Sequence, residues 1–172
     1  MRITACPVLV AFLILAGCTR GIPQSPPHPS LAQPIPSRTE RTVDGRTTVR
    51  VPAPGKVTVI DVWATSCAPC IKLMPAMQAL STKYAARGLV VLGVAVDDNP
   101  GLVLQRLREL GITYPNVIDA EGSVRGALRV KDLPTTLVID RAGIVRLVRA
   151  GGDAGDMEAI EQAADALLEE TK

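Results

Sequence analysis

Residues 57–70 read VTVIDVWATSCAPC, a β-branched apolar run followed by two thiols, Cys67 and Cys70, that are separated by two residues. Val57–Val62 is apolar on both alternations, which predicts a strand with both faces buried. The thiols then fall at the predicted start of a helix. Unpaired N–H groups and the positive end of the helix dipole stabilise a thiolate there. This arrangement predicts that Cys67 attacks a foreign disulfide and that Cys70 completes the exchange.

The other cysteines and the overall charge exclude several function classes. Cys6 and Cys18 lie in the N-terminal apolar stretch, so the rest of the chain has too few cysteines for a structural disulfide framework. A zinc site needs four ligands, and His28 is the sole histidine. Haem attachment needs a histidine after the second cysteine, where Ile71 stands. The net charge of +2 gives no case for nucleic acid. We expect no metal and no cofactor.

The N-terminus has the layout of an export signal. Arg2 precedes an apolar run from Pro7 to Ala16, which is too short for a comfortable membrane span of about 20 residues. The run ends in Leu-Ala-Gly-Cys at residues 15–18, which resembles a bacterial lipoprotein signal. That resemblance implies a signal peptide over residues 1–17, lipid attachment at Cys18 and a periplasm-facing place in a bacterial cell envelope. The alternative is an ordinary secretory signal, and the choice between inner and outer membrane stays open.

Prolines separate this signal from the rest of the chain. Six of them occur between Gly21 and Ser37, which predicts that residues 18–37 form a solvated, largely extended tether. Residues 38–172 are then one domain. Its expected elements are a hairpin over 39–51, strands over 57–62, 89–96, 114–118, 136–139 and 144–148, and helices over 67–87, 100–110, 123–128 and 157–167.

This order of elements predicts an α/β domain with a mixed central β-sheet flanked by helices on both faces. The active-site turn and the string Leu133-Pro134-Thr135-Thr136 resemble thioredoxin-fold disulfide oxidoreductases, most closely the TlpA-like, membrane-tethered branch, over about residues 57–172. The resemblance implies a cis peptide bond before Pro134 and a loop there that faces the two sulfurs. It also implies that Trp63, Pro69, Leu133 and Pro134 form the substrate-binding surface.

Asp61 is the polar residue that the strand pattern does not explain. A carboxylate in a buried strand is costly unless it is paired or neutral, and such groups gather at functional sites. Its position two residues before Trp63 resembles that of the buried acid of thioredoxins, which exchanges a proton with the second cysteine. Many TlpA-like proteins instead carry a glutamate three residues after that cysteine, where this chain has Leu73. The expected catalytic set is Cys67, Cys70 and Asp61.

The predicted function is therefore a protein-disulfide oxidoreductase, working as a reductase. Its expected partners are proteins with disulfides or thiols, apocytochromes among them by family analogy, and a membrane electron donor that restores the dithiol. One alternative is a thiol peroxidase, which needs a threonine three residues before the reactive cysteine, where Ala64 stands. The other is a copper chaperone using both thiols, for which His28 is poorly placed.

Overall fold

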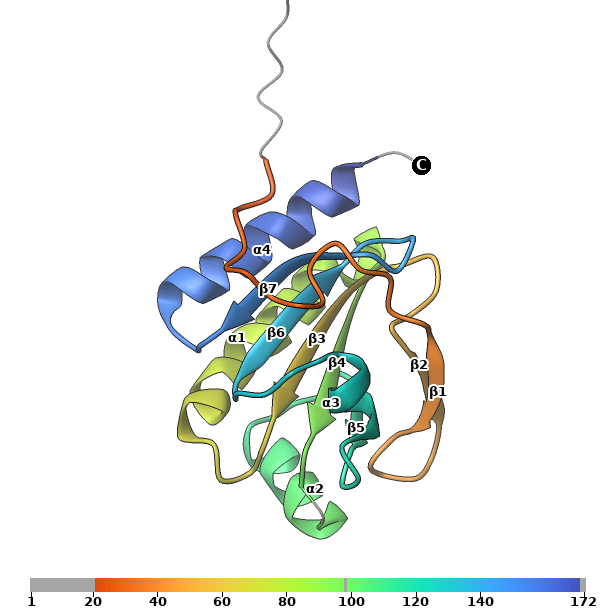
Figure 1. Cartoon of the computed structure of the whole chain (residues 1–172). Helices are drawn as coiled ribbons and strands as arrows, with labels where there is room; N and C mark the ends of the chain where they lie inside the picture. The colour runs from red at the N-terminus through yellow and green to blue at the C-terminus, as the bar shows by residue number, and fades with distance from the viewer. Residues whose placement is uncertain (1–20, 98, 171–172) are drawn as a thin grey trace, which may run out of the picture.

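The computed structural model of the protein describes residues 21–97 and 99–170. The predicted signal peptide (1–17) and Cys18 lie outside these residues. The elements, in chain order, are β1 (Arg38–Arg41), β2 (Thr48–Val51), β3 (Val57–Trp63), α1 (Ala68–Tyr84) with a 3-10 turn (Ala85–Arg87), β4 (Leu89–Ala95), α2 (Pro100–Glu109), β5 (Asn116–Ile118), α3 (Ser123–Ala127), β6 (Thr135–Ile139), β7 (Val145–Ala150) and α4 (Ala154–Glu169) (Figure 1). Each predicted element is present.

Five strands form the central sheet, in the order β5-β4-β3-β6-β7. β3, β4 and β5 run parallel, whereas β6 and β7 are antiparallel to their neighbours, so the predicted mixed sheet is confirmed. β3 lies in the centre, and all seven of its residues are buried. Its register places Asp61 between Gly93 of β4 and Thr136 of β6. The redox turn therefore leaves the most buried strand of the molecule.

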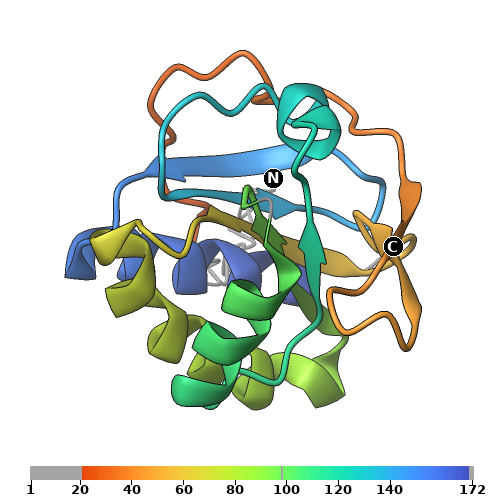
Figure 2. The ribbon, with the colours of Figure 1, turned by 90° about the horizontal axis from the view of Figure 1, so that it is seen from below.

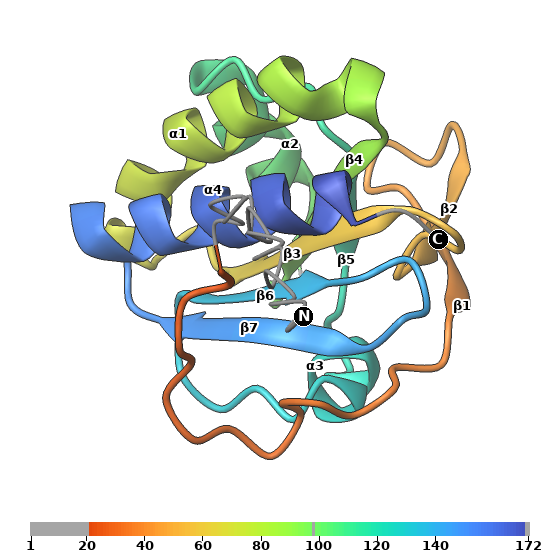
Figure 3. The same cartoon turned by 90° about the horizontal axis from the view of Figure 1, so that it is seen from above.

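The two faces of the sheet are covered differently. α1, α2 and α4 pack on one face, whereas the short α3 and the N-terminal segment lie on the other (Figures 2 and 3). Val59 and Trp63 of β3 point into the first layer, and Ile60 and Val62 point into the second. By the alternation of strand side chains, Asp61 faces the first layer, which also contains Cys70.

Side-chain caps set where the helices begin. Asn99 accepts hydrogen bonds from Gly101 N and Leu102 N at the start of α2, and Pro100 occupies its first turn, as the sequence predicts. Asp153 caps α4 by accepting from Asp156 N at 2.8 Å. Cys67 takes the same position in α1, and its sulfur accepts from Cys70 N. The first cysteine is thus part of the helix start.

The prediction of a solvated tether is wrong for residues 21–37. This segment runs along the outer edge of β7, where Ala32 N donates to Val145 O at 2.9 Å and Val145 N donates to Gln33 O at 3.1 Å. Ser30 is buried, and its hydroxyl donates to Leu128 O at 2.6 Å. The proline-rich segment supplies the hydrogen bonds that an exposed edge strand otherwise lacks, which explains why it is packed despite its composition.

The opposite edge of the sheet is covered by the β1–β2 hairpin. Val43 N donates to Asn116 O at 2.8 Å, and Thr42 forms an isolated bridge with Val117 of β5. Both outer strands of the sheet therefore have additional backbone partners. Among the described residues, no helix is long and apolar enough to cross a membrane.

We expect Ser30→Ala to lower the free energy of unfolding by about 2 kcal/mol, because it leaves the buried Leu128 carbonyl without its hydroxyl donor. Urea denaturation followed by circular dichroism measures the change. Ser66→Ala, at an exposed serine, is the matched control and should change stability by less than about 0.5 kcal/mol. Equal stability of the two variants would show that the hydrogen bond from Ser30 to Leu128 does not stabilise the folded domain.

Candidate active site

Cys67 and Cys70 form a disulfide at the N-terminus of α1, with their Cα atoms 5.3 Å apart. The two sulfurs differ in access, because Cys67 is half-buried whereas Cys70 is fully buried. Cys70 N donates to Cys67 Sγ at 3.3 Å, the contact that would stabilise a thiolate on Cys67 after reduction. Cys67 is therefore the sulfur that another molecule can reach, whereas Cys70 is shielded by the fold.

Asp97 fixes the loop that precedes the cysteines. Its two carboxylate oxygens accept from Thr65 N at 2.9 Å and from Thr65 Oγ1 at 2.5 Å. Asp97 was not identified from the sequence. Its position just after β4 could have indicated a role, because the parallel strands β3 and β4 end at the same edge of the sheet.

The loop before β6 lies against the redox turn through two glycines. The Leu133–Pro134 peptide bond is cis, as the family resemblance implies, and Pro134 O accepts from Gly151 N at 3.0 Å. A Cβ on Gly152 would lie 3.1 Å from Pro69 O and 3.3 Å from Pro134 Cγ. A side chain at Gly152 would crowd both neighbours, so the glycine favours this close approach, which brings Pro69 and Pro134 to the same place as predicted. Gly152 was missed because its role depends on contacts distant in sequence.

Fewer of the predicted substrate-binding residues are exposed at this loop than expected. Pro134 is itself buried, whereas Leu133 is half-buried and Pro69 is exposed. Leu133 and Pro69 can therefore contact a bound polypeptide directly, and Pro134 supports the loop from beneath.

The carboxyl of Asp61 is fully buried. Thr136 Oγ1 donates to Asp61 Oδ1 at 3.4 Å, and Asp61 Oδ2 has no hydrogen-bond partner. Burial raises the pKa of Asp61 from 3.8 to about 7, and the Thr136 hydrogen bond opposes this shift only in part. A carboxyl with a pKa near neutrality can both accept and release a proton at physiological pH, which is the property that the predicted role requires.

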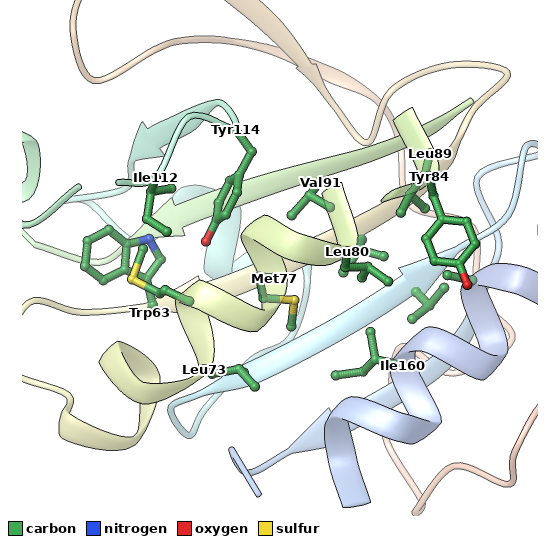
Figure 4. Close-up of a cluster of buried hydrophobic side chains, with 14 of the residues drawn as sticks. Trp63, Leu73, Met77, Leu80, Tyr84, Leu89, Val91, Ile112, Tyr114 and Ile160 are labelled. Carbon is green, nitrogen blue, oxygen red and sulfur yellow. The ribbon is translucent and has the colours of Figure 1, made fainter. Parts of the chain in front are cut away.

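Trp63 does not belong to the substrate-binding surface, contrary to the prediction. Its side chain is completely buried, and its Nε1 donates to Asn116 Oδ1 at 2.9 Å. Asn116 Nδ2 donates in turn to Tyr114 O at 2.9 Å. Figure 4 shows Trp63 and Tyr114 side by side in the layer between α1 and the sheet. An indole that reaches its only hydrogen-bond partner in the core has no edge left for a substrate.

Gly93 makes room for this hydrogen bond. It lies between Asp61 and Asn116 in the register of the sheet, and a Cβ at this position would overlap the Asn116 side chain. Neither Gly93 nor Asn116 was identified from the sequence, because a glycine in a buried strand indicates a close approach without naming the partner.

We expect Gly93→Ala to lower the free energy of unfolding by about 3 kcal/mol, because the added methyl displaces Asn116 from Trp63. The indole fluorescence of the folded protein should change as well, since Trp63 is the sole tryptophan. Thermal and urea denaturation with tryptophan emission measure both effects. Gly126→Ala is the control, because a Cβ at Gly126 has open space around it. A wild-type emission spectrum for Gly93→Ala would contradict the expectation.

A small hollow adjoins the redox turn. It has a volume of about 190 Å³ and is lined by Thr65 and Ser66 and by the outer face of α2, with Leu102, Gln105, Arg106 and Glu109. Leu102 is 52% exposed and is the one large apolar side chain with such exposure in residues 21–97 and 99–170. The surface beside Cys67 thus includes apolar area on the α2 side.

The described part of the chain contains no group of three or more His, Cys, Asp and Glu side chains placed to hold an ion. His28 Nδ1 accepts from Ser30 N at 3.1 Å within the N-terminal segment. The sole histidine is therefore engaged in local backbone structure.

The family profile described as AhpC/TSA matches residues 31–148. The chain belongs to the AhpC/TSA family. The matched residues include the redox turn, the cis-proline loop and both halves of the sheet.

Several curated relatives are named thiol-disulfide oxidoreductases. The chain is 38% identical over 98 residues to the thiol-disulfide oxidoreductase ResA of Geobacillus kaustophilus, a match that covers 56% of each chain. This AhpC/TSA family member therefore spans about half the length of the curated relatives it matches.

Solved structures confirm the expected thioredoxin-like fold. A thiol:disulfide interchange protein of the thioredoxin family from Chlorobium tepidum superposes with a TM-score of 0.69 at 27% identity, covering 78% of this chain and 95% of the other. StoA from Bacillus subtilis shares the fold alone, with a TM-score of 0.64 at 18% identity over 77% of this chain and 98% of the other.

Proposed function

We propose that this chain is a thiol–disulfide oxidoreductase that reduces disulfides of other proteins through Cys67 and Cys70. One observation carries the proposal. An accessible sulfur at a helix N-terminus is joined to a buried sulfur, and a buried carboxyl with a pKa of about 7 faces the layer that holds the second sulfur. The names of the relatives at 27–38% identity agree with this chemistry.

The reaction begins with the reduced pair. The Cys67 thiolate attacks one sulfur of the substrate disulfide, so that a mixed disulfide forms and the other substrate sulfur leaves as a thiolate. Cys70 then gives its proton to Asp61, and the Cys70 thiolate attacks Cys67. The substrate leaves as a dithiol, and the Cys67–Cys70 disulfide seen in the structure remains. Two electrons pass from the enzyme to the substrate, and a reduced thiol partner must return them.

A polypeptide substrate is supported by the surface around Cys67. Pro69 is exposed and Leu133 is half-buried, and Leu102 presents exposed apolar area in the hollow that Thr65 and Ser66 also line. A small-molecule site would instead be a concave pocket that encloses most of its ligand. The open surroundings of Cys67 suit an extended chain segment that carries a disulfide.

Turnover of insulin disulfides by the reduced protein, followed by turbidity with dithiothreitol as electron source, tests the activity. Hydrogen peroxide turnover is measured in parallel. We expect insulin reduction above the dithiothreitol background and peroxide consumption at background, because Ala64 stands where a peroxidase needs threonine. The reverse pattern would establish a thiol peroxidase and contradict the proposal.

The direction of electron flow is tested by the reduction potential of the Cys67–Cys70 couple, measured by equilibration with glutathione. A reductase should have a potential below about −200 mV, whereas strong oxidants lie near about −120 mV. Tryptophan emission is a second way to follow the oxidised and reduced states, because Trp63 belongs to the same buried cluster as Cys70. A potential near the oxidising value would replace the reductase by a disulfide-forming enzyme.

We propose further that the protein acts outside the cytoplasm, attached by lipid at Cys18, and receives electrons from a membrane donor. The lipoprotein-like pattern at residues 15–18 supports this proposal. So does the sequence after Cys18, whose two cysteines are Cys67 and Cys70, because a spare thiol would exchange with other proteins in an oxidising compartment. Labelling with a palmitate analogue in a bacterial host should mark the full chain and leave Cys18→Ser unlabelled. Equal labelling of both would contradict lipid attachment at Cys18. Apocytochromes are one substrate class for trapping experiments.

A further inference from the structure

The hydroxyl of Tyr114 is buried without a hydrogen-bond partner in the layer that Asp61 also faces. Tyr114 is 5% exposed, and its hydroxyl points into the layer that contains Trp63 and Met77 (Figure 4). Asp61 Oδ2 is likewise buried without a partner. Burial raises the pKa of Tyr114 well above its usual value, and the negative charge of Asp61 adds to this shift. One group that can donate and one that can accept therefore face the same layer, each without a partner.

The position of Tyr114 is fixed by its backbone. Its carbonyl accepts from Asn116 Nδ2 at 2.9 Å, and its N–H donates to Gln78 Oε1 at 3.4 Å. Asn116 is itself held by Trp63 Nε1 and fits over Gly93, the strand neighbour of Asp61. These hydrogen bonds use the backbone of Tyr114, so its hydroxyl remains available for a hydrogen bond to Asp61.

No charged side chain competes for this role among the described residues that line the layer. α1 contributes Cys70 and apolar side chains, α4 contributes alanine, isoleucine and leucine, and α2 contributes Val103 and Leu107. The neighbouring strands contribute Thr136 and Gly93. Tyr84, at the far end of α1, donates to Glu161 at 3.1 Å. The ionisable groups near Asp61 are therefore the thiol of Cys70 and the hydroxyl of Tyr114.

We propose that Tyr114 is a positioning residue whose hydroxyl donates a hydrogen bond to ionised Asp61, directly or through one water, and so lowers the pH at which Asp61 can take the Cys70 proton. This inference rests on the proposed function. In the step concerned, the proton moves from Cys70 Sγ to Asp61, leaving a Cys70 thiolate, while Tyr114 keeps its own proton. A donor to the charged form of a carboxyl lowers its pKa.

Tyr114→Phe removes the donor and little else. We expect the pH midpoint of insulin reduction to move upward by about one unit, because a carboxylate that loses a hydrogen-bond donor is less stable relative to its protonated form. The Asp61 carboxyl signal in 13C NMR should titrate with the same upward shift, which gives a readout independent of turnover. Tyr84→Phe is the matched control and should leave both midpoints unchanged, because its hydroxyl binds Glu161 at the surface.

The double variant decides whether Tyr114 acts through Asp61. In an Asp61→Asn background, Tyr114→Phe should cause no further change in the pH profile. An unchanged Asp61 midpoint in Tyr114→Phe, or an equal shift with and without Asp61, would overturn the inference. If the wild type fails to reduce insulin, the proposed function is wrong, yet the NMR titration still tests the pairing. Loss of an unpartnered hydroxyl should not unfold the protein, which melting at pH 5 checks.

Discussion

Cys67→Ser is expected to reduce insulin turnover to the level of buffer with dithiothreitol, because the accessible sulfur makes the first bond to the substrate. Cys70→Ser should behave differently. Its Cys67 can still attack, but the buried resolving sulfur is gone, so a mixed disulfide with the substrate should accumulate. Non-reducing electrophoresis and mass spectrometry of both variants with an oxidised protein substrate measure the two outcomes.

The asymmetry between the two variants is the decisive result. A trapped complex on Cys70→Ser, released by reductant and absent from Cys67→Ser, would match the difference in exposure between the sulfurs. The double variant lacking both thiols is the control for noncovalent association. Trapping by Cys67→Ser instead would mean that Cys70 attacks the substrate, which contradicts its burial.

Asp61→Asn should stabilise the oxidised protein at pH 8 and slow its reaction. Burial raises the Asp61 pKa from 3.8 in the unfolded chain to about 7, so between about pH 4 and 7 the folded state holds a proton that the unfolded state releases. The free energy of unfolding of the wild type therefore falls as pH rises through this window and is level above it. Three pH units correspond to about 4 kcal/mol, which is the upper limit of the gain.

Urea denaturation of oxidised wild type and Asp61→Asn at pH 4.5, 6 and 8 measures this linkage. The variant should show little change over the window, and its advantage should grow with pH. Asp132→Asn, at an exposed aspartate, is the control and should follow the wild type. A wild type whose stability rises from pH 5 to 8, or a variant with no gain at pH 8, would show that Asp61 ionises freely in the folded state.

Much of the fold was predictable because each element carries its own local signal. The doubly apolar runs became β3 and β4, Asn99-Pro100 began α2, and Asp140–Gly143 formed the turn between β6 and β7. The proline-rich segment misled for a physical reason. Proline composition indicates an extended chain without helix or sheet, and an extended chain can equally be solvated or hydrogen-bonded to an edge strand.

The candidate site likewise contains residues that the sequence identifies and residues that only the structure could place. Cys67, Cys70 and Asp61 stand out from the sequence because thiols at a helix start and a carboxyl in an apolar strand each have few physical explanations. Trp63 was placed on the wrong surface because its neighbours in sequence lie at the turn, whereas its side chain points inward.

The sequence by itself determined which strand carries the two thiols, where their helix begins and that a carboxyl is buried behind them, because periodicity, capping and burial are properties of neighbouring residues. Only the tertiary structure decided that Gly152 lies against both the redox turn and the cis-proline loop, that Asn116 lies over Gly93 and binds Trp63, and that Tyr114 lies in the layer that Asp61 faces. These contacts join residues 18 to 83 positions apart. Their partners are selected by strand order and register, which no local pattern encodes.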